Sequence, residues 1–302
     1  MPPFAATLLI ERALVAVNGA DAVSFLDNLA TNALDTLLPG DARFAALLTP
    51  QGKILFEFFA LRTADGFLLE ALRAKAAELI KRLTLYKLRA KVTIAEHISA
   101  VSVSPTPAGL SFADPRHGDL GYRCIGTHVT SCNASTYDAH RIALGVPEGG
   151  RDYALGDTFP HEANYDLVNG VSFTKGCFVG QEVVARMQNK TVVRKRVVKI
   201  TGASPLSEGA AILIGDADIG RIGSVDGKRA LALLRLDRVA EARAKGQVLT
   251  TWGQTPRLDG QSIASTVDRA GSDPIAAIVI VPDPESLARY ARSVAERPVI
   301  DL

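Results

Sequence analysis

The sequence predicts an α+β protein that ends in a second, smaller β domain. The chain has 302 residues, which is too long for one ordinary hydrophobic core. Strand-like and helical patterns alternate over the first two hundred residues, whereas short strand-like runs separated by turns follow residue 197. We therefore expect a mixed α+β region over residues 1–200 and a small antiparallel β-barrel within residues 201–302. The tail from about residue 257 is unassigned.

The first region contains three helical patterns. Apolar residues with helical spacing follow Asp21, which would cap a helix over residues 22–29. The second pattern covers residues 73–85, and the third covers residues 137–144 and would end at Gly145. Strand-like runs occupy residues 14–17, 44–48, 54–61, 67–69, 91–95 and 100–103. Asp65-Gly66 between two of these runs predicts a hairpin.

Strand-like runs in the last third of the chain are short and separated by turns. They cover residues 197–201, 211–214, 222–225 and 230–236. Asp226-Gly227 lies between the last two runs and again predicts a hairpin. This spacing favours a small antiparallel barrel.

Composition and charge exclude several classes of protein. Hydrophobic residues make up 47% and charged residues 22% of the chain, as in a folded protein, and the net charge of +2 gives no overall attraction to nucleic acid. Three cysteines (Cys124, Cys132 and Cys177) form neither a disulfide framework nor a metal-ligand spacing, so we expect a reducing compartment and no metal site. The first residues lack the pattern of a signal or transit peptide, and the apolar run 275–281 is too short to span a bilayer. We therefore expect a cytoplasmic protein without a membrane segment.

Cys177 is the candidate functional thiol. It stands in Lys175-Gly-Cys-Phe-Val-Gly-Gln-Glu182, between Gly176 and Gly180 and ahead of a predicted helix. A helix start and a nearby lysine are typical surroundings of reactive thiols, and glycine permits close approach of a ligand. The alternative is that Cys177 is a buried, inert side chain.

Basic residues are concentrated next to this cysteine. Residues 175–199 contain seven basic side chains and a single acid, Glu182, and residues 73–91 form a second basic stretch. Such segments could bind a polyanion, or they could be solvated ends of helices and strands. Because aromatic residues are not interleaved with these charges, we do not expect nucleic acid as a partner.

His161 lies upstream of Cys177 and could serve as its base in a cysteine hydrolase. The sequence contains no recognisable orienting partner or oxyanion turn, so we favour a structural role for this histidine. No paired acids or phosphate-binding glycine loop indicate another reaction.

The segment from Lys175 to Arg186 resembles the KGCxxGQE signature of the YgfZ family, which belongs to the aminomethyltransferase (glycine-cleavage T-protein) superfamily. The resemblance extends over roughly residues 8–255. It includes the first helical pattern with Thr31-Asn32, the stretch Leu48 to Ile54, and Phe159 to Ala163. Asp114-Pro-Arg116 and residues 230–235 resemble the subgroup close to the mitochondrial iron–sulfur assembly factor.

The resemblance implies a cloverleaf of three subdomains, of which the first two are interleaved in sequence and the third is the barrel. It further implies a folate-binding auxiliary protein for assembly or repair of iron–sulfur enzymes, including tRNA-modifying ones. Tetrahydrofolate, in polyglutamylated form, would be the cofactor, and iron–sulfur client enzymes or assembly factors would be the partners. Cys177 would be the catalytic thiol, and the cofactor-binding residues would be Lys175, Gly176, Gly180, Gln181, Glu182, Arg186 and Glu57.

Two departures from the family pattern argue against glycine-cleavage chemistry. Aminomethyltransferases carry adjacent aspartates in the first hairpin, where this chain has Phe56 and Glu57. The glutamate of their Arg-x-Glu-Ala-Gly motif corresponds to Ala143. The iron–sulfur auxiliary protein has two alternatives. One is a tetrahydrofolate-dependent aminomethyl transferase, which these departures disfavour, and the other is a tRNA-binding module, which the basic segments suggest.

Overall fold

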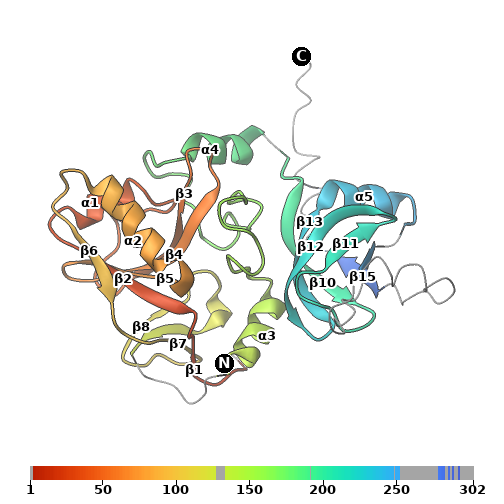
Figure 1. Ribbon diagram of the computed structural model, residues 1–302, viewed down its shortest axis with the longest axis horizontal. Helices are drawn as coiled ribbons and strands as arrows, with labels where there is room; N and C mark the ends of the chain where they lie inside the picture. Colours follow the sequence, from red (N-terminus) through yellow and green to blue (C-terminus); the bar gives the residue numbers. More distant parts are fainter. Residues whose placement is uncertain are drawn as a thin grey trace, which may run out of the picture. The chain divides into compact units, whose positions relative to one another are not determined.

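The computed structural model describes residues 3–126, 133–190, 192–247, 249–251 and 278–282, together with residues 285, 288 and 292. The chain forms two compact units, Met1–Thr191 and Val192–Leu302, and each has an apolar core of its own (Figure 1).

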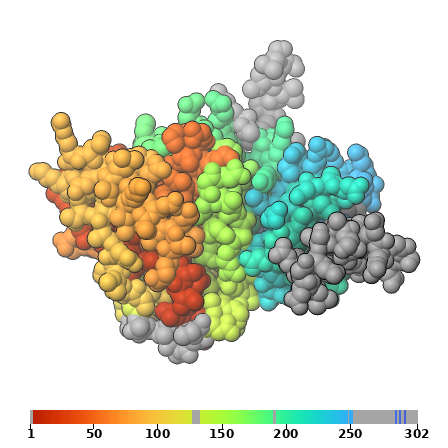
Figure 2. All heavy atoms as spheres, in the orientation of Figure 1, coloured from red at the N-terminus to blue at the C-terminus, as the bar shows by residue number. Residues whose placement is uncertain are grey.

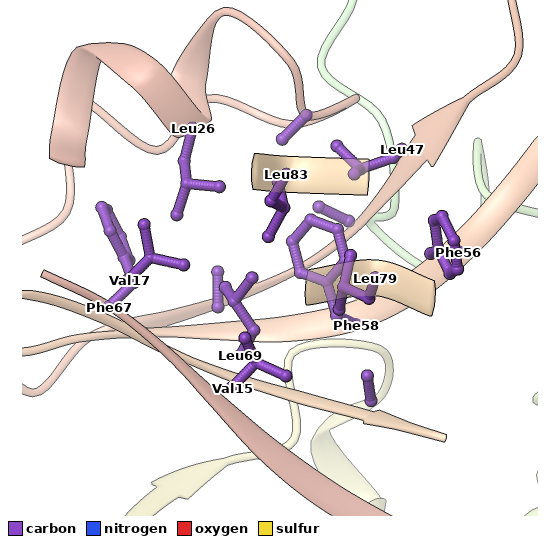
Figure 3. Close-up of a cluster of buried hydrophobic side chains, with 14 of the residues drawn as sticks. Val15, Val17, Leu26, Leu47, Phe56, Phe58, Phe67, Leu69, Leu79 and Leu83 are labelled. Carbon is purple, nitrogen blue, oxygen red and sulfur yellow. The ribbon is translucent and has the colours of Figure 1, made fainter. Parts of the chain in front are cut away.

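The largest sheet of the first unit has five antiparallel strands in the order β3-β4-β5-β2-β6. These are β2 (Arg12–Asn18), β3 (Ala42–Leu48), β4 (Ile54–Arg62), β5 (Gly66–Leu72) and β6 (Thr93–His97). Helices α1 (Ala22–Asp27) and α2 (Arg73–Lys87) pack on this sheet, and their apolar side chains share one core cluster with it (Figures 1 and 3).

Side chains of the five-stranded sheet alternate between two buried faces, because successive residues of a strand point to opposite sides. Val15, Phe58 and Leu69 point into the helix-covered core shown in Figure 3. Their strand neighbours Glu57 and Glu70 are also buried but do not belong to that core. The sheet therefore holds an apolar layer on one side and charged groups on the other.

The predicted hairpin at Asp65-Gly66 is confirmed, since β4 and β5 pair directly across it. The helix after Asp21 is also present, but it ends at Asp27, and Asp21 makes no side-chain cap hydrogen bond. Its Oδ2 instead accepts a hydrogen bond from the backbone N–H of Lys91, at 2.7 Å. The expected cap is thus wrong, because the carboxylate ties the helix start to a distant loop.

A second sheet of the first unit has the strand order β1-β7-β9-β8. Its strands are β1 (Thr7–Leu8), β7 (Val101–Ser104), β8 (Leu110–Ala113) and β9 (Tyr122–Ile125). The chain enters this sheet with β1, builds the five-stranded sheet, and then returns with β7, so the two sheets are interleaved in sequence. A 3-10 helix (Gly118–Leu120) and α3 (Ser135–Leu144) follow, and α3 ends at Gly145 with a φ of 76°, as predicted.

The second unit is a closed antiparallel barrel with the strand order β10-β13-β12-β11-β14-β15. Its strands are β10 (Lys195–Gly202), β11 (Ala211–Ile214), β12 (Ala217–Asp226), β13 (Arg229–Arg235), β14 (Leu249–Thr251) and β15 (Ile278–Pro282). Helix α5 (Leu236–Ala244), which the strand pattern did not predict, contributes Leu236 and Val239 to the barrel core. The unassigned tail supplies β15, which pairs with both β10 and β14 and so closes the barrel.

Candidate functional site

Cys177 lies on an exposed loop four residues before α4 (Gln181–Lys190). Gly176 beside it has no positive φ, and a Cβ at that position would meet nothing within 4 Å. Phe178 on the other side is buried and fixes the loop to the unit. Because the thiol is exposed, the alternative of a buried, inert Cys177 is wrong.

The other two cysteines differ from Cys177. Cys124 is fully buried, and burial raises the pKa of its thiol, whereas Cys132 lies outside the described residues.

Lys175 holds the cysteine loop against the end of α1. Its ammonium donates to the carbonyl oxygens of Asp27, Ala30 (2.9 Å) and Asn32 (3.0 Å), and it lies 3.3 Å from Asp27 Oδ1. The Lys175 side chain is only 2% exposed. Three carbonyls match the three protons of an ammonium group, so this lysine acts as a clamp within the protein.

Two further hydrogen bonds join the same segments. Thr31 Oγ1 donates to the carbonyl of Gly170 at 2.7 Å, and Asn32 Nδ2 donates to the carbonyl of Asn169 at 2.7 Å. Both contacts cross almost 140 residues of sequence. The Thr31-Asn32 pair and the cysteine motif therefore form one structural assembly, which we call the loop clamp (Thr31, Asn32 and Lys175).

Gly180 and Gly52 fix the other end of the loop. Gly180 has a φ of 81°, and a Cβ there would lie 2.8 Å from the carbonyl oxygen of Thr49. A Cβ at Gly52, whose φ is 80°, would lie 2.8 Å from Cβ of Val183. The turn between β3 and β4 thus packs directly on the start of α4, and only glycine fits at either position.

Two of the predicted binding residues of α4 face solvent. Glu182 and Arg186 form an exposed ion pair across one helical turn, with Arg186 Nη2 at 3.3 Å from Glu182 Oε1. Gln181 begins the helix and is half-buried. Cys177 shares its loop and the first turns of α4 with Gly176, Gly180, Gln181, Glu182 and Arg186, whereas the side chain of Lys175 is directed into the clamp.

Glu57, the remaining predicted site residue, is buried on β4 rather than exposed. Its Oε2 accepts hydrogen bonds from the backbone N–H of Gly149 (3.0 Å) and from the Tyr153 hydroxyl, and its Oε1 lies 3.5 Å from Arg12 Nη1. Phe56 beside it belongs to the apolar core and lies at one edge of the cluster in Figure 3.

Glu57 belongs to a buried charged network that the sequence patterns did not reveal. Arg12 links Glu57, Glu70 (3.0 Å) and Glu148 (3.7 Å). Arg123 joins Glu70 to Asp114. The network contains four arginines and five carboxylates, all buried: Arg12, Arg116, Arg123, Arg141, Glu57, Glu70, Asp114, Glu148 and Asp152.

Aromatic rings complete the network. The guanidinium groups of Arg12, Arg116 and Arg123 lie 4.3–5.6 Å from the centre of the Phe59 ring. Such contacts stabilise cations that have lost their water shell. Tyr137 accepts hydrogen bonds from Arg116 (3.1 Å) and Arg123 (3.0 Å).

The network lowers the pKa of two of its carboxyl groups. Burial alone would raise the pKa of Asp114, but the charges of Arg116 and Arg123 outweigh burial and lower it to about 2. Burial opposes ionisation of Glu148 as well, and Arg141 and Arg12 together lower its pKa to about 2. Both groups are therefore carboxylates at neutral pH.

One sequence signal could have revealed this network. Glu57 and Glu70 each stand inside an otherwise apolar strand, in ILFEFFALR and GFLLEAL. A lone carboxylate in such a run requires a buried cation. Its partners could not be named, since Arg12 and Glu70 are 58 residues apart in sequence.

The remaining sequence features concern His161, metal ligands and membrane-spanning helices. His161 is buried, its Nε2 lies 2.9 Å from Gln188 Oε1, and its ring packs near Phe173. Within the described part of the chain, no group of three or more His, Cys, Asp and Glu side chains could hold a metal ion. No described helix has both the length and the apolar character that crossing a membrane requires.

Several known proteins are similar to this chain in sequence. A family model described as the CAF17 C-terminal beta-barrel domain matches residues 194–258. The mitochondrial iron-sulfur cluster assembly factor IBA57 of Homo sapiens is 32% identical over 272 residues, with 76% of each chain covered. The Mus musculus protein of the same name is 33% identical over 275 residues, also with 76% of each chain covered. A homolog from Mycosarcoma maydis is 33% identical over 223 residues, covering 63% of this chain and 55% of the relative.

A solved structure shares the fold. The glycine cleavage system aminomethyltransferase T from Bartonella henselae matches with a TM-score of 0.70 and 17% identity, covering 95% of this chain and 87% of that chain. The predicted α+β aminomethyltransferase-like fold with a C-terminal barrel is confirmed. The expected cytoplasmic location is wrong by comparison, because the human, mouse and fungal relatives are mitochondrial proteins by name.

Proposed function

The chain belongs to the CAF17/IBA57 family, and from this premise we propose that it is an auxiliary protein for the assembly or repair of iron–sulfur clusters. The observation that carries the proposal is the exposed Cys177 thiol on a loop that the loop clamp and Gly180 hold in place. A thiol fixed on the surface can meet a macromolecular partner, which a buried thiol cannot.

In this proposal Cys177 acts on the cluster as cargo. Iron–sulfur clusters are bound by cysteine thiolates, generally four per cluster. Cys177 supplies one thiolate, and a client protein supplies the remaining ligands. A Cβ at Gly176 would meet nothing within 4 Å, so the loop next to Cys177 leaves room for a bulky cluster or partner.

We further propose that the first unit binds tetrahydrofolate, in polyglutamylated form. Arg12 Nη2 is a buried donor and Glu70 Oε2 a buried acceptor, and neither has a hydrogen-bond partner among the described residues. A pterin ring offers both acceptors and donors, so these atoms fit such a ligand. Gly176, Gly180, Gln181, Glu182 and Arg186 remain proposed contacts, while Lys175 and Glu57 would position the surrounding backbone.

Calorimetry tests the folate proposal. Tetrahydrofolate should bind, and polyglutamylated forms should bind more tightly, with a gain that shrinks as salt is raised. Arg186→Ala should reduce the gain from the tail and leave monoglutamate affinity unchanged. A tail length without effect on affinity would remove Arg186 from the site.

Genetic rescue tests the role of the thiol. In a strain lacking this protein, wild type should restore the activity of iron–sulfur enzymes and Cys177→Ser should not. Cys124→Ser is the matched control, because Cys124 is buried in β9 and should be dispensable. Full rescue by Cys177→Ser would refute the proposed role.

Aminomethyl transfer is the less favoured function. It needs an acid placed to handle the folate amine, and proton transfer by such a group contributes roughly 10²–10⁴-fold. Phe56 lies in the apolar core, and both oxygens of Glu57 face protein partners. We expect no appreciable glycine-cleavage turnover by the purified protein with a lipoyl carrier protein, even where folate binds.

A further inference from the structure

A groove of about 690 Å³ runs between α2 and the start of β4, away from the charged network. Its apolar lining consists of Leu55, Phe56, Leu85 and Leu88, which we call its apolar floor. Residues 73–91, which include α2, lie at the surface of the first unit in the amber region of Figure 2. The groove is thus an apolar depression on an accessible helix.

Two leucines of this groove are exposed to solvent. Leu85 is 65% exposed and Leu88 is 89% exposed. Leu88 also has a φ of 43°, a strained conformation that bulky residues rarely adopt. With a ψ of -106°, Leu88 lies outside the left-handed helical region, in a conformation that suits glycine better than leucine. The groove therefore combines two exposed leucines with an unfavourable backbone conformation at one of them.

The rim of the groove is cationic. Lys81, Arg82 and Lys87 border it, whereas the one acid, Glu78, already pairs with Lys75 at 2.5 Å. Among the described residues, Lys81 and Lys87 take part in no ion pair. The groove consequently combines an apolar floor with uncompensated positive charge, and its natural complement is apolar on one side and acidic on the other.

We propose that this groove, formed by Leu55, Phe56, Leu85 and Leu88 with the rim cations, binds an acidic amphipathic helix of a partner protein. Leucine-type side chains spaced by three and four residues would enter the apolar floor, and flanking carboxylates would meet Lys81 and Lys87. A polyglutamate tail would leave the floor unfilled, and a lipid surface fits a convex face better than a groove.

The groove and the cysteine loop are joined through one strand. Leu55 follows Gly52 by three residues, which corresponds to roughly 10 Å of extended chain, and Gly52 contacts Val183 of α4. A helix bound in the groove would therefore hold its protein within reach of Cys177. That this partner carries an iron–sulfur cluster rests on the proposed function, whereas the docking itself does not.

Fluorescence anisotropy with a synthetic peptide tests the docking. The probe is a labelled helix of about 16 residues with leucines on one face and glutamates on the other. One control peptide has the same composition but scattered leucines, and a second control carries lysines in place of the glutamates. We expect the designed peptide to bind at least tenfold more tightly than either control, with affinity that falls as salt rises.

Variants of the full chain locate the binding site. Leu88→Asp and the double variant Lys81→Glu with Lys87→Glu should each weaken binding at least fivefold. Leu38→Asp is the matched control, because Leu38 is 70% exposed and lies outside the groove. Leu88→Gly should raise the melting temperature, since it relieves the positive φ, and should still weaken binding.

The outcomes separate this proposal from the role of the thiol. Cys177→Ser should bind the peptide normally even though it fails in rescue, and Leu88→Asp should lose peptide binding whatever the rescue result for Cys177→Ser. Equal binding of the designed and scattered peptides, or unchanged binding by Leu88→Asp, would overturn the docking. Tighter binding of anionic vesicles or of hexaglutamate than of the peptide, lost in the same variants, would assign the groove to another ligand and overturn it as well.

Discussion

At the scale of single residues, Lys175 positions the cysteine loop and does not direct its charge at the thiol. Its sequence position suggests electrostatic support for the neighbouring thiol. In the structure, burial lowers the pKa of Lys175, although Asp27 opposes that shift. The ammonium points at the carbonyl end of α1, where a cation complements the helix dipole. The lysine of the motif thus determines where Cys177 lies.

Replacing Lys175 should loosen the cysteine loop. Lys175→Met keeps the aliphatic stem but leaves three carbonyls without their donor, so we expect the free energy of unfolding to fall by about 2 kcal/mol. Urea unfolding measures this change. Arg186→Met, at a 66% exposed side chain, is the control and should stay within about 0.5 kcal/mol of wild type. Equal effects of both substitutions would contradict the clamp.

At the scale of elements, the contact between the β3–β4 turn and the start of α4 decides which glycines of the motif are structural. Gly180→Ala places a Cβ against the Thr49 carbonyl at a positive φ, so stability should fall by about 1–3 kcal/mol. Gly176→Ala enters open space and should leave stability unchanged. Thermal unfolding measures both variants. A stability loss for Gly176→Ala as large as that for Gly180→Ala would show that the loop is packed differently.

Strand β15 makes the barrel depend on the C-terminal part of the chain. A chain truncated after Thr251 loses the strand between β10 and β14 and exposes two strand edges. We expect its melting temperature to fall by at least about 5 °C and the protein to self-associate. A chain truncated after Pro282 retains β15 and is the control. Size-exclusion chromatography and thermal unfolding would show whether only the shorter chain changes.

At the scale of the whole molecule, the sequence patterns predicted those features that depend only on residues close together in the chain. Asp65-Gly66 and Asp226-Gly227 are hairpin turns as expected, because turn chemistry is contained in a few residues. The assembly of distant groups was not predictable in this way. Lys175 and Asp27 lie 148 residues apart, and nothing near Lys175 in sequence indicates that its charge is satisfied by α1. Strand β9 escaped prediction because Arg123 interrupts its apolar pattern while it is neutralised by Glu70.

The buried network also predicts how the first unit responds to acid. The pKa values of Asp114 and Glu148 are lowered to about 2 from ordinary values of 3.8 and 4.5. A group with a lowered folded-state pKa contributes stability above its unfolded-state pKa and loses that contribution as pH falls toward the folded-state pKa. Asp114 should therefore contribute about 2 kcal/mol and Glu148 about 3 kcal/mol at neutral pH, and both contributions are lost progressively between about pH 5 and pH 2.

Asp114→Asn tests this acid dependence. The substitution removes the titrating group and leaves Arg116 and Arg123 partly unpaired, so stability at pH 7 should fall by about 3 kcal/mol. The decrease in stability from pH 5 to pH 2 should also become shallower than in wild type. Urea unfolding followed by tyrosine near-ultraviolet circular dichroism reports on this unit, because Tyr137, Tyr153 and Tyr165 are buried within it. Glu241→Gln changes an exposed carboxylate of the barrel unit and should leave both quantities unchanged. A pH slope equal to that of wild type in Asp114→Asn would mean that other carboxyl groups drive acid unfolding.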